Sequence, residues 1–161
     1  MVSKIAPTIK RLGRGSHIVP EQREISFSEL TFRTAVLDSL LANIAVLDST
    51  GEILAVNLSW KEFANANQLN DSNLGIGANY LDVCRSASFD PNARAALEGI
   101  RGVMKGHLSF FYLKYPCHSP RHVRWFALRA SPLIDYPHFV VVTHENITEQ
   151  VLTRIGVRPR R

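Results

Sequence analysis

The sequence predicts an α+β domain in which helices cover one face of a five-stranded antiparallel sheet. A clear helix pattern over residues 91–104 lies between a hairpin pattern and three consecutive strand patterns that begin after His107. Helices and strands that occur in separate runs are typical of α+β domains. The length of 161 residues and the 45% of hydrophobic residues fit one globular domain and exclude a two-domain enzyme.

The chain is expected to begin with a flexible basic leader, residues 1–25, followed by a flanking helix over residues 26–41. The leader contains prolines and glycines among scattered charges and shows no periodicity. Ser26 and Glu29 have the spacing of a capping box, which marks a helix start. The apolar residues of this helix cover more than one narrow stripe, so part of them should need a partner. We expect a homodimer interface that includes Leu30, Val36, Leu37 and Leu40.

A hairpin and a helix are predicted next. Apolar runs at residues 43–48 and 53–57 flank a turn in which Gly51 supplies the positive φ. A second capping box, from Ser59 to Glu62, predicts the start of a helix. The segments that follow are predicted to be a loop over residues 67–77 and a short helical turn over residues 80–85.

The long helix is the clearest element of the sequence. Asp90 is a typical N-cap, and Pro91 stands at the first helical position, where its missing N–H costs nothing. Gly99 and Gly102 each cost about 1 kcal/mol relative to Ala inside a helix, so close packing or a nearby ligand should compensate for them.

Aromatic and β-branched residues after this helix predict three antiparallel strands, at residues 108–115, 123–133 and 138–143. Alternation in the first of them puts Phe111, Leu113 and Tyr115 on one face and Phe110 and Tyr112 on the other. The sequence does not fix which of these two faces is the inner one.

The net charge of +5 belongs to the tails and not to the body of the domain. Residues 1–24 carry +3, residues 25–150 carry −2, and residues 151–161 carry +4. Because a nucleic-acid-binding domain carries its positive patch on the folded body, this distribution disfavours nucleic-acid binding and leaves it only to the tails. No stretch approaches the ~20 apolar residues of a membrane span, and the basic residues between 4 and 14 lead into no apolar signal core. We expect a cytoplasmic protein that does not enter the membrane.

Short motifs in the predicted order resemble those of PAS domains, the sensor modules of bacterial signalling proteins. Residues 55–64 resemble the strand-to-helix passage of these sensors, and residues 77–85 resemble their central helical segment. Tyr-Pro-Cys-His-Ser-Pro at 115–120, followed by Arg-Trp-Phe at 124–126, resembles a subgroup found in front of histidine kinases and diguanylate cyclases. The resemblance implies a PAS-like fold over residues 42–148, with residues 149–161 as a short basic tail or a truncated output helix.

The last motif, Asn-Ile-Thr-Glu, resembles the terminal motif of the family, which usually reads Asp-Ile-Thr. In PAS domains this motif joins the last strand to an output helix, so the resemblance implies that it transfers the signal. Asn146 and Glu149 also have the spacing of a capping box, which would start that helix. Ile147 should anchor the joint in the core. The predicted signal-transfer residues are therefore Asn146, Ile147, Thr148 and Glu149.

A PAS-like fold encloses a cavity between its sheet and its helices, and aromatic and apolar residues should fill the core or line that cavity. The candidates for a ligand pocket are Trp60, Phe63, Tyr80, Cys84, Ile100, Met104, Phe111, Trp125, Phe126 and Val141.

The sequence lacks the motifs with which known PAS sensors attach flavin or heme. Photoactive flavin sensors carry Asn-Cys-Arg, whereas here Asn79 is followed by Tyr80 and Cys84 comes one helical turn later. We therefore expect no adduct-forming flavin. No covalent heme is expected either, because Cys-x-x-Cys-His is absent.

No metal site and no catalytic residues are predicted. Cys117, His118 and His122 are interpreted as solvated loop residues, because a fourth ligand would have to come from a distant segment.

The prediction for function is a PAS module that dimerises and relays a signal to an output kinase or cyclase, on the same chain or a separate one, with a small molecule as its ligand. One alternative is a purely structural dimerisation or adaptor domain without a ligand. The other is nucleic-acid binding through the basic tails.

Overall fold

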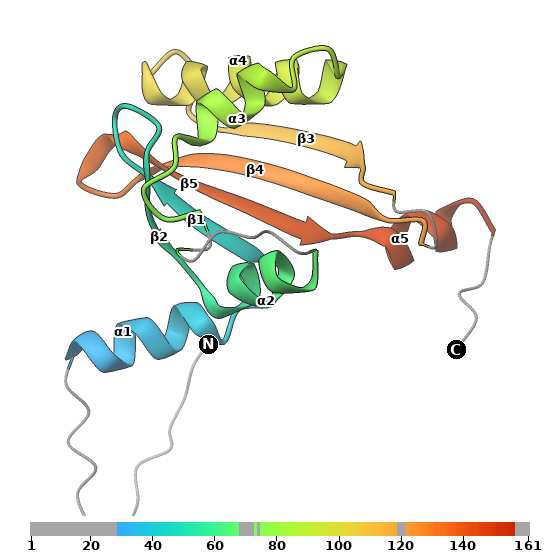
Figure 1. Ribbon diagram of the computed structural model, residues 1–161, viewed down its shortest axis with the longest axis horizontal. Coiled ribbons are helices and arrows are strands. Elements are labelled where there is room, and N and C mark those ends of the chain that lie inside the picture. Colours follow the sequence, from blue (N-terminus) through green and yellow to red (C-terminus); the bar gives the residue numbers. More distant parts are fainter. Residues whose placement is uncertain (1–28, 68–72, 74, 119–121, 157–161) are drawn as a thin grey trace, which may run out of the picture.

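A five-stranded antiparallel sheet in the order β2-β1-β5-β4-β3 forms the centre of the computed structural model (Figure 1). The structure describes residues 29–67, 73, 75–118 and 122–156. The strands are β1 (Asn43–Leu47), β2 (Ile53–Val56), β3 (Phe111–Pro116), β4 (Trp125–Leu133) and β5 (Tyr136–Asn146). The helices are α1 (Glu29–Asp38), α2 (Leu58–Ala66), α3 (Tyr80–Ser86), α4 (Pro91–Met104) and α5 (Thr148–Arg154).

The predicted fold class and the β1–β2 hairpin are confirmed. Gly51 adopts a φ of +93° in the turn. The Asp48 carboxylate supports the same turn by accepting hydrogen bonds from the backbone N–H groups of Thr50 and Glu52, at 2.8 and 2.9 Å. The predicted leader and the Ser26 half of the first capping box lie outside the described residues.

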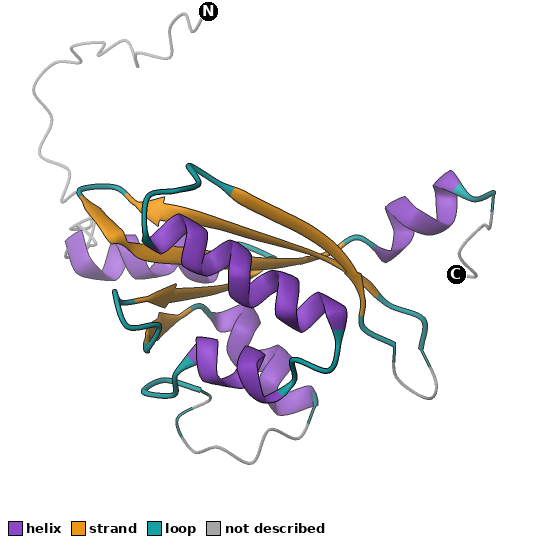
Figure 2. Cartoon of the chain, turned by 90° about the horizontal axis from the view of Figure 1, so that it is seen from above, coloured by secondary structure: helices purple, strands orange, loops and turns teal. Residues whose placement is uncertain are grey.

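Helix α4 begins as the sequence predicts, with Pro91 in its first turn and Asp90 as its N-cap, which accepts from the backbone N–H of Asn92 at 2.8 Å. Its apolar stripe is buried against strands β3, β4 and β5. Figure 2 shows α4 lying across the sheet, with the shorter helices beside it. Close packing accounts for the glycines of α4, since a Cβ on Gly99 would overlap the ring of Phe111 and one on Gly102 would lie 2.8 Å from Leu108 Cδ1.

The prediction that Ser59 caps helix α2 is wrong. The N-cap is Asn57, whose Oδ1 accepts from the backbone N–H groups of Trp60 at 3.1 Å and of Ile44 at 2.9 Å. The Ser59 hydroxyl instead donates to the carbonyl of Leu41 at 2.8 Å. Asn57 lies two residues earlier than Ser59, and its side chain accepts from backbone N–H groups of both β1 and α2.

The last three strands differ from the prediction at their ends, and β4 starts at Trp125 and not at residue 123. Strand β3 starts at Phe111 and not at residue 108, because the N–H groups of His107 and Leu108 both bond to the carbonyl of Gly102 and close the end of α4. Strand β5 reaches from Tyr136 to Asn146, longer than the predicted 138–143. It pairs with β4 on one side and β1 on the other, which fixes its full length.

Register resolves which face of the sheet is inner. One row of paired residues crosses four strands on the same face: Leu113 on β3, Leu128 on β4, His144 on β5 and Asn43 on β1. Residues on this face, with Phe111 and Tyr115, lie against α2, α3 and α4, whereas Phe110 and Tyr112 are exposed on the other face.

Helices α1 and α5 project from opposite ends of the domain (Figures 1 and 2). Helix α1 ends at Asp38 and not at residue 41, because the chain leaves the helix to meet Asn57, whose Nδ2 donates to the carbonyls of Leu37, Leu40 and Ala42 at 2.9 to 3.2 Å. Over the described residues, no helix is both long enough and apolar enough to cross a membrane.

Candidate functional site

Three hydrogen-bonded aromatic side chains, two from the inner face of the sheet and one from α3, form a cluster in the domain. The Tyr80 hydroxyl lies 2.9 Å from Nε2 of His144, and the Tyr115 hydroxyl lies 2.7 Å from its Nδ1. One imidazole therefore joins the first residue of α3 to a residue near the end of β3. We refer to these side chains as the Tyr–His–Tyr triad.

Local structure fixes each member of the triad. Tyr80 opens α3 directly after the N-cap Asn79, whose Oδ1 accepts from the N–H of Asp82 at 3.1 Å and whose Nδ2 donates to the carbonyl of Thr50 at 2.9 Å. His144 pairs with the inner-face residue Leu128, and Tyr115 lies two residues from the inner-face residue Leu113. Strand alternation therefore places both side chains on the inner face. The hairpin turn thus positions one tyrosine, and the sheet register positions the other two groups.

Burial keeps the triad uncharged near neutral pH. It lowers the pKa of His144 from its ordinary value of 6.5 to about 4, because the charged imidazolium would lose its hydration. Burial also raises the pKa of Tyr80 and of Tyr115 above the ordinary value of 10. The imidazole is therefore neutral, with one N–H donor and one acceptor nitrogen, and both phenols keep their protons.

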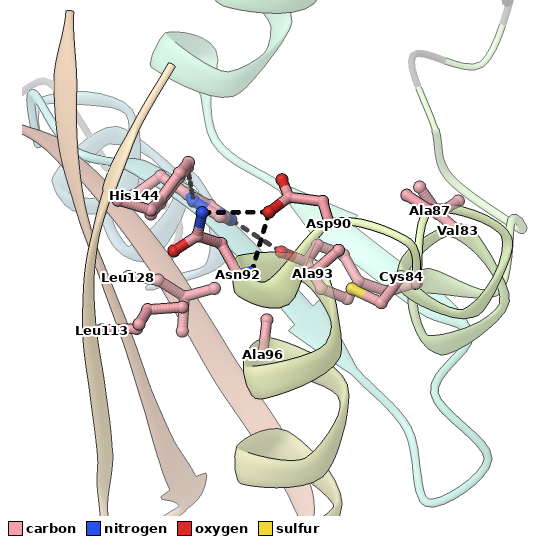
Figure 3. Close-up of a pocket in the computed structure, with 12 residues that line it drawn as sticks. Val83, Cys84, Ala87, Asp90, Asn92, Ala93, Ala96, Leu113, Leu128 and His144 are labelled. Carbon is pink, nitrogen blue, oxygen red and sulfur yellow. Dashed lines mark hydrogen bonds between the residues drawn. The ribbon is translucent and has the colours of Figure 1, made fainter.

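Two cavities border the triad. The α4 cavity has a volume of about 180 Å³ and lies between α3, the start of α4 and the sheet. Figure 3 shows Leu113 and Leu128 on its sheet side, Cys84 and Ala87 on the α3 side, and Asn92 at the start of α4. The α2 cavity has a volume of about 200 Å³ and is lined by aromatic residues that include Trp60, Phe63 and Phe126. All three triad residues line both cavities.

A more polar cavity of about 380 Å³ reaches His144 from the side of α2, and Glu62 and Arg124 lie in its wall. The Arg124 guanidinium is already engaged. Its Nε donates to the carbonyl of Cys117 at 3.1 Å, its terminal nitrogens lie 3.4 and 3.5 Å from Oδ1 of Asn67, and its Cζ lies 5.8 Å from the centre of the Phe63 ring.

Half of the predicted pocket residues line the two cavities. Those that do are Trp60, Phe63, Tyr80, Cys84 and Phe126. Ile100, Met104 and Phe111 belong instead to the packing between α4 and the sheet. Trp125 and Val141 point to the opposite face, because each neighbours an inner-face residue along its strand.

His144, Tyr115 and Leu128 line the cavities but are not among the predicted pocket residues. Alternation places His144 on the same face as Val140 and Val142, and it places Tyr115 on the same face as Leu113.

The thiol of Cys84 lines the α4 cavity, and burial raises its pKa from 9.0 to about 11. It is therefore protonated at neutral pH. Among the described residues, no three His, Cys, Asp or Glu side chains are placed to hold a metal ion.

The predicted signal-transfer residues lie at the joint between β5 and α5. Ile147 is buried, and its N–H donates to the carbonyl of Trp125 at 2.9 Å. The capping box from Asn146 to Glu149 does not form. Asn146 Oδ1 instead accepts from the N–H and the hydroxyl of Thr148, at 3.1 and 2.6 Å, and the N-cap position of α5 is Ile147, which makes no side-chain cap hydrogen bond. Thr148 Oγ1 in turn accepts from the N–H of Trp125 at 2.9 Å.

All four predicted dimer residues are exposed; Leu30, Val36 and Leu37 lie on α1, and Leu40 lies just after its C-terminal end. The exposed fractions are 75% for Leu30, 48% for Val36, and 45% for both Leu37 and Leu40. Within the described residues, the contacts of α1 with the domain are made mainly at its C-terminal end, through Asn57 and through the Asp38 carboxylate, which accepts from the N–H of Leu58 at 2.8 Å.

No family model matches the chain. A Rhodobacter capsulatus protein, described as an uncharacterized 104.1 kDa protein in the hypE 3′ region, is 42% identical over 120 residues. That match covers 71% of this chain and 12% of the relative, so the chain spans a small part of the length of the curated protein it matches.

Solved structures with a similar fold include PAS domains. The PAS domain of BvgS from Bordetella pertussis has a TM-score of 0.54 and 16% identity, and the match covers 79% of this chain and 93% of that one. VqmA of a phage, in complex with DPO, has a TM-score of 0.53 and 16% identity, with 79% and 56% covered. A PAS domain from Colwellia psychrerythraea has a TM-score of 0.50 and 14% identity, with 74% and 98% covered. The chain therefore has the PAS fold.

Proposed function

We propose that this chain is a non-catalytic, cytoplasmic PAS module that binds a small molecule beside the Tyr–His–Tyr triad and relays its presence through α5 to an output partner. It would act as a homodimer. The output partner would be a kinase or a cyclase, on the same chain or a separate one.

The observation that carries this proposal is the position of His144 on β5. His144 borders both cavities, and only Glu145 separates it from Asn146, which holds the hydroxyl of Thr148 at the start of α5. A ligand that moved the imidazole would act on the same strand that ends in this joint. The backbone hydrogen bonds of β5 to β1 and β4 would carry such a displacement toward the joint.

Two comparisons support the proposal. VqmA, whose fold is similar, is solved in complex with the small molecule DPO. The Rhodobacter capsulatus relative is many times longer than the matched segment, which agrees with a module that works beside other domains.

Dimerisation through α1 is supported by its exposed apolar residues. Leu30 is largely exposed, and Val36, Leu37 and Leu40 each leave nearly half of their apolar surface exposed. A second copy of the helix would bury this surface, which is favourable by roughly 25 cal/mol per Å². The same observation favours the second candidate function, a dimerisation or adaptor domain without a ligand.

Native mass spectrometry of the purified protein, compared with denaturing mass spectrometry, separates these two functions. The sensor predicts a co-purified small molecule that the denatured protein has lost, and an adaptor predicts equal masses. Ala93→Leu, which narrows the α4 cavity, should reduce the bound fraction. Ala95→Leu, on the same helix but outside the cavity lining, is the matched control and should retain it. Equal masses in the unmodified protein would contradict a resident ligand.

A further inference from the structure

The Tyr–His–Tyr triad holds one more proton than its hydrogen bonds use. The two phenols and the neutral imidazole carry three acidic protons, and the two hydrogen bonds at His144 use two of them. If Nδ1 carries the ring proton, Tyr80 donates to Nε2 and the hydroxyl proton of Tyr115 is unused. In the other tautomer the hydroxyl proton of Tyr80 is the unused one.

This unused proton faces a cavity. Within the described part of the chain, neither hydroxyl has a hydrogen-bond partner other than the imidazole. Both tyrosines line both cavities, so a molecule in either of them can reach the hydroxyl. A buried donor without an acceptor is unfavourable, which favours a ligand that supplies one.

The charge around the two cavities limits the class of ligand. Their lining residues include no lysine or arginine among the described residues, so a buried anion would lack a counter-ion. The one carboxylate in the lining, Asp90, accepts two hydrogen bonds from Asn92. Aromatic rings make up much of the α2 cavity wall, and flat molecules pack well against such rings.

We propose that the Tyr–His–Tyr triad is the recognition element of these cavities and selects an uncharged, aromatic small molecule whose hydrogen-bond acceptor takes the unused hydroxyl proton. This inference rests on the proposed ligand-binding function and names the ligand class. The lowered pKa of His144 agrees with it, because a neutral ring leaves the proton count unchanged over the physiological range.

Four probes of equal heavy-atom number test the ligand class on the full chain at pH 7: acetophenone, α-methylstyrene, benzoate and 1-phenylethylamine. Acetophenone is neutral and carries an acceptor, α-methylstyrene has the same shape without one, and the other two are charged. Titration calorimetry should show acetophenone binding about tenfold more tightly than α-methylstyrene, the value of one hydrogen bond made in a buried site. Benzoate and 1-phenylethylamine should bind more weakly than acetophenone.

Tyr80→Phe and Tyr115→Phe test whether the triad causes this preference. In the variant that removes the donating hydroxyl, the ratio of the acetophenone and α-methylstyrene affinities should fall, because the proton left unused by the remaining tyrosine–imidazole pair then lies on a different atom. The ratio is informative because general damage to the cavity would weaken both ligands. Tyr112→Phe, which removes an exposed hydroxyl from the outer face of the same strand, is the matched control and should keep the full ratio.

Nitrogen-15 NMR of His144 gives a second measurement on the unmodified protein, which does not depend on how the variants fold. Acetophenone should shift the balance between the two ring nitrogens, and α-methylstyrene should leave it unchanged. Equal effects of these two probes, an unchanged ratio in both tyrosine variants, or tighter binding of a charged probe would each overturn the proposal. Binding of none of the probes would also overturn it, whereas the proposed function would still be judged by the co-purified ligand.

Discussion

The ring of Phe111 lies directly against the backbone of Gly99. A Cβ built on Gly99 would overlap Cγ, Cδ2 and Cε2 of this ring. The absence of a side chain at position 99 therefore sets the distance between α4 and β3. That distance in turn positions the side of the α4 cavity that α4 forms, which includes Ala93 and Ala96.

Gly99→Ala should destabilise the protein by roughly 1–3 kcal/mol, the usual range for overpacking a core, although Ala is the better helix former by about 1 kcal/mol. Urea denaturation measures the free energy of unfolding. Gly102→Ala is the control, because its Cβ would meet Leu108 Cδ1, the far end of an exposed, flexible side chain. The free energy of unfolding of Gly102→Ala should lie within about 1 kcal/mol of that of the unmodified protein. Equal losses in the two variants would contradict the role of Phe111.

Local patterns predict most elements of this fold because the forces that define them are local. Asp90 and Pro91 start α4 through contacts within one turn, and Asp48 and Gly51 close the β1–β2 turn through contacts within five residues. The capping of α2 is a limit of this reasoning. Ser59 and Asn57 are both good N-caps, and the choice depends on the N–H of Ile44, which lies 13 residues away.

The triad shows the same limit at the site. His144 meets Tyr80 across 64 residues and Tyr115 across 29, so no local pattern marks the three as partners. Alternation does indicate that His144 shares a face with Val142. Which face is inner depends on the face that α4 packs against. That packing requires a residue without a side chain at position 99, because a Cβ there would overlap the ring of Phe111.

Asn57→Ala should cost about 2–4 kcal/mol in the free energy of unfolding. The variant loses the N-cap of α2, worth about 1 kcal/mol, and leaves the buried N–H of Ile44 without its acceptor. It also loses the donor that holds the carbonyls at the end of α1, so limited proteolysis should cut α1 earlier. Asn67→Ala, at the exposed end of α2, is the matched control and should change the stability by less than about 1 kcal/mol. An equal loss in both variants would contradict the bridging role of Asn57.

The stability of the protein should fall on acidification in a defined window. His144 is neutral in the fold down to a pKa of about 4, whereas in the unfolded chain it takes up a proton near its ordinary pKa of 6.5. The unfolded state therefore binds more protons between these values. The free energy of unfolding should decrease, by on the order of 3 kcal/mol, as the pH falls from about 6.5 to 4, with no contribution from this group to the slope above 6.5.

His144→Gln measures this contribution, because an amide can also donate and accept one hydrogen bond but does not titrate. Denaturation at a series of pH values should give a smaller slope between pH 4 and 6.5 in the variant. The other histidines contribute equally to both proteins and cancel in the comparison. The same slope in both would mean that the fold protonates His144 as readily as the unfolded chain does.

Leu40→Asp should convert a dimer into a monomer without unfolding the domain. Its side chain is 45% exposed just after the C-terminal end of α1, so the change removes apolar surface from the proposed interface and places a charge there. Light scattering measures the mass, and circular dichroism checks the fold. Phe89→Asp is the matched control, because Phe89 is also an exposed apolar residue, 89% exposed, but lies between α3 and α4. A monomeric unmodified protein, or a folded Leu40 variant that stays dimeric, would rule out this interface.

Thr148→Val should loosen α5 while leaving the cavities intact. Thr148 Oγ1 accepts from the N–H of Trp125 on β4 and donates to Asn146 on β5, so one hydroxyl fastens the start of the helix to two strands. Valine keeps the shape and the β-branch but makes neither bond. With seven residues, α5 is shorter than the ~12–15 that an isolated helix needs, and it depends on this attachment.

Amide hydrogen exchange at Val151 and Ile155, whose N–H groups close the helix, should become about tenfold faster in Thr148→Val, the effect of about 1.4 kcal/mol. Thr153→Val, at an exposed position of the same helix, is the control for the intrinsic preference of valine and should leave the exchange nearly unchanged. If exchange in α5 is as fast in the Thr153 variant as in the Thr148 variant, or unchanged in both, the joint at Thr148 does not hold the helix, and a signal from β5 would have to leave the domain by another route.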